Sequence, residues 1–376
     1  MNDSFRTTDK IVAQCSRDNK DVHLNLSQMK LFASGYSSNV YSGVAKTDSS
    51  HEMNIVIKKT WKSCWFREEL EILRSLGKFQ HKNVAQLLYS YTKEHKARVC
   101  LSLIFEYEPQ NLYQFLKENN RRLDILEVKL ITWQLFRGQY HIQKSNICHR
   151  DIKPQNLLYN ADTGHLKICD FGFAQILNAT TPLPSYHVAR YYRPPELLLG
   201  SKFHSCNVDV WSCGCVFAEL LKGRVFLAGN STTNQAELIF DALGCPTEED
   251  LTAMQVNNTT YQEIKTGYKP DPARRTLHFS FMYEQSDNTQ MDRRTFVHNN
   301  KINEREMRES VDLLRQILVY NPERRLSGID LLTHEYFDDL FFSNSMRSNG
   351  RVLCLTLEDF QAVETGDETV SQESTV

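Results

Sequence analysis

The chain has 376 residues, a formal net charge of −2 and a sequence pI near 6.6, and this balance gives no reason to expect nucleic acid as a partner. No apolar run approaches the ~20 residues that span a bilayer, so no membrane partner is expected. Ten scattered cysteines without CxxC pairs, and no apolar signal stretch in residues 1–20, predict reduced thiols in the cytoplasm or the nucleus.

The first part of the chain predicts a small sheet with one helix. Residues 1–26 are polar and aperiodic, which predicts a mobile tail. Apolar residues recur at a helical period in one stretch, 66–76, through Phe66, Leu70 and Leu73. The runs that are typical of strands lie at 29–33, 40–44, 54–58, 84–91 and 100–105.

From about residue 110 the pattern favours helices, which makes the chain α+β. Leu126, Leu130 and Trp133 form an apolar stripe on a long helix that runs towards residue 142. Further helices are expected at 208–221, which is apolar nearly all round, and at 308–318 and 328–332. Residues 341–376 are Ser-rich and then acidic, which predicts a second solvated tail.

The strongest chemical pattern is His149-Arg150-Asp151-Ile152-Lys153-Pro154-Gln155-Asn156, followed by Asp170-Phe171-Gly172. This order and spacing suit phosphoryl transfer. Asp151 can accept the proton of a hydroxyl nucleophile, and Lys153 can balance charge on the transferred group. Asn156 and Asp170 are hard oxygen donors of the kind that Mg²⁺ prefers. The alternative is a surface loop with coincidental acids.

A lysine and a glutamate upstream form a second candidate pair. Lys58 ends the strand-like run at 54–58, and Glu69 lies eleven residues later on the expected helix. A strand lysine held by a helix glutamate can grip the α- and β-phosphates of a nucleotide. Lys59 is the adjacent competitor, and alternation favours Lys58 because it places Lys58 on the inward face with Val56. The alternative is a solvated ion pair.

With these motifs the chain resembles the eukaryotic protein kinases over about residues 29–340, and within them the glycogen synthase kinase 3 group. The Arg-Tyr-Tyr-Arg run at 190–193 is typical of the wider branch that includes the cyclin-dependent and mitogen-activated enzymes. The segments that carry the resemblance are 54–60, 133–137, 147–158, 166–172, 185–186, 190–200, 209–221 and 242–247.

The resemblance implies a bilobal α+β fold. Its kinase domain would span 27–340, with an N-lobe at 27–105, a hinge at 106–109 and a C-lobe at 110–340. It also implies serine/threonine protein kinase activity, with ATP and Mg²⁺ as cofactors and protein substrates as partners.

The implied ATP site lies between the two lobes. Lys58 and Asp170 would meet the phosphates and their metal, under a loop that contains Ala33 and Gly35. Phe105 would stand behind the adenine, and the backbone of Glu106 and Glu108 in the hinge would bind it. The apolar residues that would sandwich the adenine are Val40, Val56, Leu158 and Cys169, each of which could otherwise be ordinary core.

Further residues would have structural or regulatory roles. Glu196 would pair with Arg325, and Asp209 would hold the backbone of the catalytic loop. Tyr186 matches the activation-segment tyrosine that relatives autophosphorylate, with Arg190 and Arg193 as nearby cations for its phosphate. The alternative for Tyr186 is an unmodified side chain packed on the lobe.

Four departures from the family pattern stand out, and three of them concern the phosphate loop, one helix and the C-lobe groove. Only Gly35 remains of three glycines over the phosphates, and Ala33 and Ser38 each add a Cβ, so a loss of about 1.4 kcal/mol would slow turnover roughly tenfold. Gly138 destabilises a helix by about 1 kcal/mol relative to Ala, so the helix before the catalytic loop is expected to be frayed. Residues 261–304 match the family poorly, so binding of a scaffold protein in the C-lobe groove cannot be carried over.

The fourth departure concerns substrates. The pocket that receives a priming phosphate in glycogen synthase kinase 3 uses three cations, and the matching positions here are Glu68, Arg150 and Gln175. Arg150 keeps its cation, Gln175 is neutral and Glu68 carries the opposite charge. We therefore expect the preference for primed substrates to be weak or absent.

Three functions compete on these grounds. The depleted glycine loop favours a pseudokinase, an ATP-binding scaffold with little turnover. Intact Lys58, Glu69, Asp151, Asn156 and Asp170 favour an active protein kinase. A small-molecule phosphotransferase would not need the segment at 190–196, which builds a peptide platform.

Overall fold

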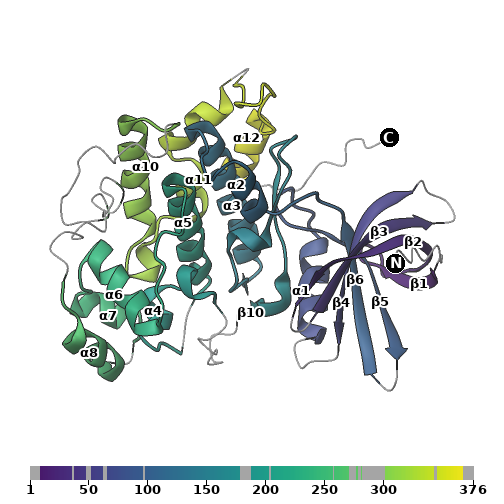
Figure 1. The fold of residues 1–376 in the computed structure, drawn as a ribbon, viewed down its shortest axis with the longest axis horizontal. Coiled ribbons are helices and arrows are strands. Elements are labelled where there is room, and N and C mark those ends of the chain that lie inside the picture. Colours follow the sequence, from purple (N-terminus) through teal and green to yellow (C-terminus); the bar gives the residue numbers. More distant parts are fainter. Residues whose placement is uncertain are drawn as a thin grey trace.

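The computed structural model describes residues 9–35, 38–47, 52–61, 66–95, 98–177, 188–202, 205–256, 258–270, 277, 281, 301–342 and 345–366. The chain forms two lobes, a strand-rich one with a single helix and a larger helical one (Figure 1). This α+β architecture confirms the fold class expected from the sequence.

Six antiparallel strands of the N-lobe close into a barrel in the order β1-β2-β3-β4-β6-β5. Its interior is filled by alternate residues such as Leu24, Leu26, Ile55 and Ile57, which are almost completely buried. The strands are β1 (Asp9–Cys15), β2 (Asp21–Ser34), β3 (Ser38–Thr47), β4 (Met53–Trp61), β5 (Leu87–His95) and β6 (Arg98–Glu106).

The expectation of a mobile tail through residue 26 is wrong for residues 9–26. β1 pairs with β2 along its length and closes the barrel on β5 through Gln14↔Ser90 and Cys15↔Tyr89. The signal was present in the sequence, because Val22, Leu24 and Leu26 alternate with polar residues at the strand period of two.

Helix α1 (Phe66–Gly77) lies between the barrel and the C-lobe. Its buried residues Ile72, Leu73 and Leu76 belong to the large core that continues into the C-lobe. Arg74 donates hydrogen bonds to Gln14 of β1 and to Ser90 of β5, so the N-terminal strand also contacts this helix.

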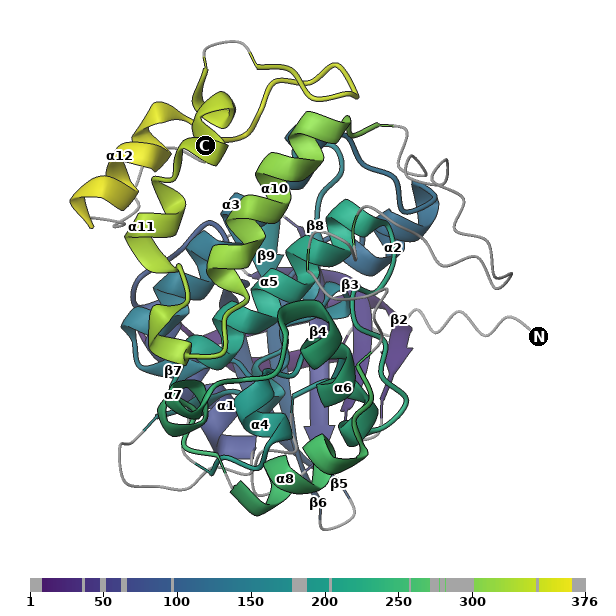
Figure 2. The same cartoon turned by 90° about the vertical axis from the view of Figure 1, so that its left-hand side faces the viewer.

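The C-lobe is built around two buried helices, α3 (Ile125–Lys144) and α5 (Asn207–Lys222). Figure 2 shows α10 crossing in front of α5, with α11 beside it. The other helices are α2 (Leu112–Glu118), α4 (Pro195–Leu198), α6 (Thr232–Leu243), α7 (Glu248–Ala253), α8 (Asn258–Gly267), α10 (Glu304–Ile317), α11 (Gly328–Leu332) and α12 (Leu357–Thr365).

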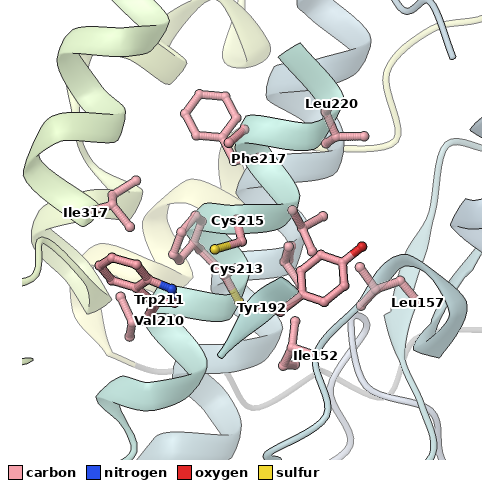
Figure 3. Packing of buried hydrophobic residues seen from close by; sticks show 14 of the residues in the cluster. Ile152, Leu157, Tyr192, Val210, Trp211, Cys213, Cys215, Phe217, Leu220 and Ile317 are labelled. Carbon is pink, nitrogen blue, oxygen red and sulfur yellow. The ribbon is translucent and has the colours of Figure 1, made fainter. Parts of the chain in front are cut away.

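Short elements between α3 and α4 carry the predicted chemical motif. They are the strands β7 (Ile147–Cys148), β8 (Leu157–Tyr159), β9 (Leu166–Ile168) and β10 (Gln175–Ile176) and the 3-10 helices η1 (Pro154–Asn156), η2 (Phe171–Phe173) and η4 (Arg190–Tyr192). Ile152 and Leu157 of this segment pack with Tyr192 and α5 in the core of the lobe (Figure 3). The catalytic segment therefore rests on tightly packed apolar side chains.

The expected fraying of the helix before the catalytic segment is wrong. α3 is continuous to Lys144, and Gln139 and His141 in its last turns are buried. A Cβ on Gly138 would lie 2.7 Å from the carbonyl oxygen of Asn83 and 3.0 Å from Ile168. Glycine at this position therefore lets a segment of the N-lobe approach the helix closely.

The expected solvated tail after residue 340 is also wrong for residues 345–366. Arg347 forms a bidentate, buried ion pair with Glu127 of α3, at 2.7 and 3.0 Å. Helix α12 follows and packs beside α11, with Val363 fully buried (Figures 1 and 2). This segment belongs to the folded C-lobe.

Candidate active site

The backbone of the catalytic segment is held from below by Asp209 of α5. The two carboxylate oxygens of Asp209 accept hydrogen bonds from the backbone nitrogens of His149 (2.6 Å) and Arg150 (2.8 Å). Arg150 adopts the left-handed conformation (φ 62°) at this point. The His149 ring contacts the carbonyl oxygen of Cys169 at 3.0 Å, which ties this segment to the one that carries Asp170.

Three predicted residues meet at one carboxylate, that of Asp151. The Lys153 ammonium lies 2.6 Å from Asp151 Oδ2, and Asn156 Nδ2 donates to the same oxygen at 2.7 Å. Asn156 also donates to the backbone carbonyl of Asp151 at 2.8 Å. Because its amide nitrogen is used in this way, the side-chain oxygen is the atom of Asn156 that can ligate a cation.

Lys58 joins the two lobes. Its ammonium lies 2.6 Å from Glu69 Oε1 on α1 and 2.7 Å from Asp170 Oδ1. The interior of the barrel is taken by Ile55 and Ile57, so Lys58 and Val56 occupy the opposite face of β4, towards the C-lobe. The preference for Lys58 over Lys59 agrees with this geometry, because Lys58 shares the face of Val56 and its side chain, 14% exposed, is turned to Glu69 and Asp170.

The charges of this cluster support one another. Burial works against ionisation of Lys58, but Asp170 and Glu69 outweigh it and raise the pKa of Lys58. Burial also opposes the charge on Asp170, yet Lys58 holds the pKa of that carboxyl below its ordinary value. Burial raises the pKa of Asp151, and Lys153 offsets this only in part.

The residues expected around the adenine come from both lobes. Val40 is the cross-strand partner of Lys58, and Val56 is that of Phe105. Leu158 stands on β8. A cavity of about 190 Å³ beside the hinge is lined by Leu158, Phe105, Glu106 and Glu108, but its other walls are Lys167 and residues of segment 80–88. Val40, Val56 and Cys169 do not line it, so this cavity is distinct from the expected adenine site. Val40, Val56, Leu158 and Cys169 are all half-buried, as residues at the wall of a cleft would be.

The loop expected over the phosphates is an exposed hairpin. Ala33 pairs with Val40, and the Gly35 nitrogen donates to the Ser38 carbonyl at 2.8 Å. Ala33, Gly35 and Ser38 all lie outside the positive-φ region. The conformational freedom that glycine provides is therefore not used at these positions in this conformation.

The oxygen donors fit Mg²⁺. The Asp170 side chain is 43% exposed and uses one oxygen for Lys58, which leaves the other for a cation. Within the described part of the chain, no group of three or more His, Cys, Asp or Glu side chains could hold a metal by itself. A Mg²⁺ bound by Asp170 and Asn156 would therefore complete its shell with phosphate oxygens and water, as this ion commonly does.

Comparison with known proteins decides the family. The model of the protein kinase domain matches residues 26–337. The chain is a member of the protein kinase family. Among curated proteins it is 37% identical over 324 residues to "Glycogen synthase kinase 1" of Pyricularia oryzae, a match that covers 84% of this chain and 73% of that protein. The kinase is thus similar to the glycogen synthase kinases, as the sequence motifs indicated.

The platform that follows the activation segment is braced by a buried ion pair. Arg325 forms two hydrogen bonds to Glu196, at 2.8 and 2.6 Å, and both side chains are almost completely buried. Tyr186 lies outside the described residues. The guanidinium groups expected near it contact backbone oxygens: Arg190 donates to Asn230, and Arg193 donates to Val188.

Sequence reasoning missed Lys167 of the kinase. Its ammonium lies 2.5 Å from Glu108 and 3.3 Å from Glu106, so it ties both ends of the hinge to β9. The available signal was alternation, because the flanking Leu166 and Ile168 are fully buried and Lys167 must face the other way.

Among the described helices, none is long and apolar enough to cross a membrane.

Proposed function

We propose that this kinase is an active, ATP-dependent serine/threonine kinase of protein substrates. The observation that carries the proposal is the bridge from Glu69 through Lys58 to Asp170, because it joins the two lobes at the place where a nucleotide's phosphates would lie. The exposed hairpin with a single glycine favours the alternative, an ATP-binding pseudokinase, but it removes no charged group from the site.

Each side chain has a distinct chemical role in this proposal. Asp151 orients the substrate hydroxyl and accepts its proton, and Lys153 stabilises charge on the transferred phosphoryl group. Lys58, held by Glu69, binds the α- and β-phosphates. Asp170 and Asn156 would hold Mg²⁺, which neutralises charge on the phosphates when bound.

The nucleotide would lie between the lobes. Val40, Val56 and Leu158 would enclose its adenine, which the backbone of Glu106 and Glu108 would bind. Ala33 and Gly35 would cover the phosphates. Lys167 supports this arrangement because it fixes both hinge carboxylates from the side of β9.

The proposed substrates do not need a priming phosphate. Arg150 is 2% exposed, its Nε donates to the Phe173 carbonyl at 2.8 Å, and Glu68 is a negative charge that acts on it. Gln175 adds no charge, and α1 packs against its strand, β10. A phosphate at this position would meet one buried cation and a carboxylate, which is unfavourable.

Turnover separates the active kinase from the pseudokinase. Radiolabelled phosphate transfer from ATP to a generic serine/threonine peptide should exceed that of Asp151→Asn by about 10²–10⁴-fold. Both proteins should be stabilised by ATP with Mg²⁺, by about 2.7 kcal/mol at 100 times Kd. Stabilisation without turnover above the Asp151→Asn control would establish the pseudokinase instead.

A matched pair of primed and unprimed peptides tests the substrate class. The kinase should phosphorylate the two with similar kcat/KM. The double variant Glu68→Arg, Gln175→Lys restores the cations, so it should prefer the primed peptide by about tenfold or more, the effect of about 1.4 kcal/mol. A strong preference for the primed peptide in the unaltered kinase would refute this part of the proposal.

Two further expectations remain proposals. Tyr186 would be autophosphorylated, and a scaffold protein would bind the C-lobe groove only if residues 261–304 retain its shape. Tryptic mass spectrometry of the purified kinase, with Asp151→Asn as the control, would detect a phosphate on Tyr186.

A further inference from the structure

Asp359 is a buried acid far from the proposed catalytic groups. It lies in the first turn of α12 and is 3% exposed. Oδ2 accepts hydrogen bonds from the nitrogen (3.0 Å) and hydroxyl (3.1 Å) of Thr356, which closes a capping box. Oδ1 lies 2.7 Å from Arg137 and 2.9 Å from Lys82. Both oxygens are therefore used.

The two cations at Asp359 come from different lobes. Arg137 stands on α3 of the C-lobe, and both it and Asp359 are buried. Lys82 belongs to segment 78–86, which connects α1 to β5 of the N-lobe. The pair with Arg137 connects α12 to the C-lobe. The pair with Lys82 connects α12 to the N-lobe as well, so Asp359 links the two lobes. The pair with Arg137 is buried, whereas the Lys82 side chain is 46% exposed, so the contact with Lys82 adds little net stability and acts on the position of its segment.

Segment 78–86 already bridges the two halves of the active site. The Asn83 carbonyl accepts from the Ile168 nitrogen at 2.9 Å, and the Ala85 nitrogen donates to the Ile168 carbonyl at 2.9 Å. Asn83 Nδ2 donates to Gln134 of α3 and to the Leu166 carbonyl. The segment thus follows the helix of Glu69 and is hydrogen-bonded to the strand that precedes Asp170.

We propose that Asp359 is a positioning residue for phosphoryl transfer. From α12 it holds Lys82, keeps segment 78–86 docked on α3 and β9, and so fixes Glu69 and Asp170 relative to each other. The effect on turnover rests on the proposed kinase function, whereas the effect on docking does not.

Lys82→Met tests the proposal, with Lys129→Met as the matched control. Lys129 pairs with Asp339 at 2.8 Å, and both residues belong to the C-lobe. Lys82→Met should lower kcat about three- to tenfold with little change in peptide KM, because it loosens the positioning of reacting groups. Lys129→Met should leave kcat unchanged although it removes a more buried ammonium, whose side chain is 11% exposed against 46% for Lys82. Lys82→Arg keeps the charge and should retain the kcat of the unaltered kinase.

Two readouts make the result decisive. In the Asp359→Asn background, Lys82→Met should cause no further loss of kcat, because both changes break one contact. Hydrogen exchange at the amides of Ala85 and Ile168 should accelerate in Lys82→Met but not in Lys129→Met. Unchanged exchange, or additive losses of kcat, would overturn the proposal. If the unaltered chain shows no turnover, the proposed function fails, and exchange alone decides the role of Asp359.

Discussion

The floor and the roof of the active site are built in opposite ways. The floor, residues 147–175, rests on a buried core, and Asp209 holds its backbone through two short hydrogen bonds. The roof, the hairpin at 31–40, is exposed around Ala33, Ser34 and Gly35 and is held mainly by strand pairing. Both regions would contact the same nucleotide, yet only the floor is fixed by charge and packing.

This difference shows where substitutions can accumulate. Removing one partner from a buried, charged network leaves the other partner unpaired in a poorly hydrated place, which is costly. An exposed hairpin loses only local contacts, and water replaces them. The motifs at 149–156 and 170–172 in the floor accordingly match the family pattern, whereas the roof keeps one of its three glycines.

The largest effect is expected when the buried ion pair between Arg325 and Glu196 in the C-lobe is broken. Arg325→Met should lower the free energy of unfolding by about 3–5 kcal/mol, because Glu196 would stay buried without its partner. The adjacent Arg324→Met breaks an exposed pair with Glu249 of similar length and should cost about 0–1 kcal/mol. Urea unfolding compares the two, and equal losses would break the distinction between buried and exposed charges.

Breaking the bridge between the two lobes should mainly affect turnover. Lys58→Met removes the cation between Glu69 and Asp170, so kcat/KM should fall about 10²–10³-fold. Steady-state phosphate transfer measures this. A fall of less than about tenfold would mean that the lobes are aligned by other contacts.

Two glycines compare floor and roof directly. A Cβ at Gly172 would lie 3.2 Å from Lys58 Nζ and 3.3 Å from Asp170 Oδ1, whereas a Cβ at Gly35 would meet, among the described residues, only the Ser38 carbonyl at 3.5 Å. Gly172→Ala should therefore reduce kcat/KM by about tenfold and Gly35→Ala by about threefold or less. A larger loss of kcat/KM for Gly35→Ala than for Gly172→Ala would show that the hairpin limits catalysis more than the floor does.

The smallest effect is expected on the free energy of unfolding at acidic pH. Burial opposes the charge of Asp359, but Lys82 and Arg137 outweigh it and lower its pKa below the ordinary 3.8. The stability that this carboxylate contributes is present above pH 4 and is lost as the pH falls through the lowered pKa. Asp359→Asn should therefore flatten the fall in stability below about pH 4, measured by urea unfolding at each pH.

The sequence predicted α1, α3, α5, α10 and α11 because their apolar patterns are local, whereas it did not predict α2, α4, α6, α7, α8 and α12. The apolar stripe of α3 and the order of Asp151, Asn156 and Asp170 can be read directly from the chain. The errors concern residues whose partners are distant in sequence. Asp359 reads as part of an acidic tail until Lys82 is brought against it, and Gly138 reads as a helix defect until Asn83 is seen to approach it.

The N-terminal strand β1 changes how this kinase can meet other chains. Each of the six described strands of the barrel has a hydrogen-bonded neighbour on both sides, but β1 meets β5 only through Gln14↔Ser90 and Cys15↔Tyr89. A sheet edge is the usual template for added strands, in peptide capture as well as in aggregation. In this lobe the contact with β1 covers β5 at residues 88–90 and leaves 91–95 without a partner among the described strands on that side. An added strand would therefore have only this short stretch of β5 backbone to pair with.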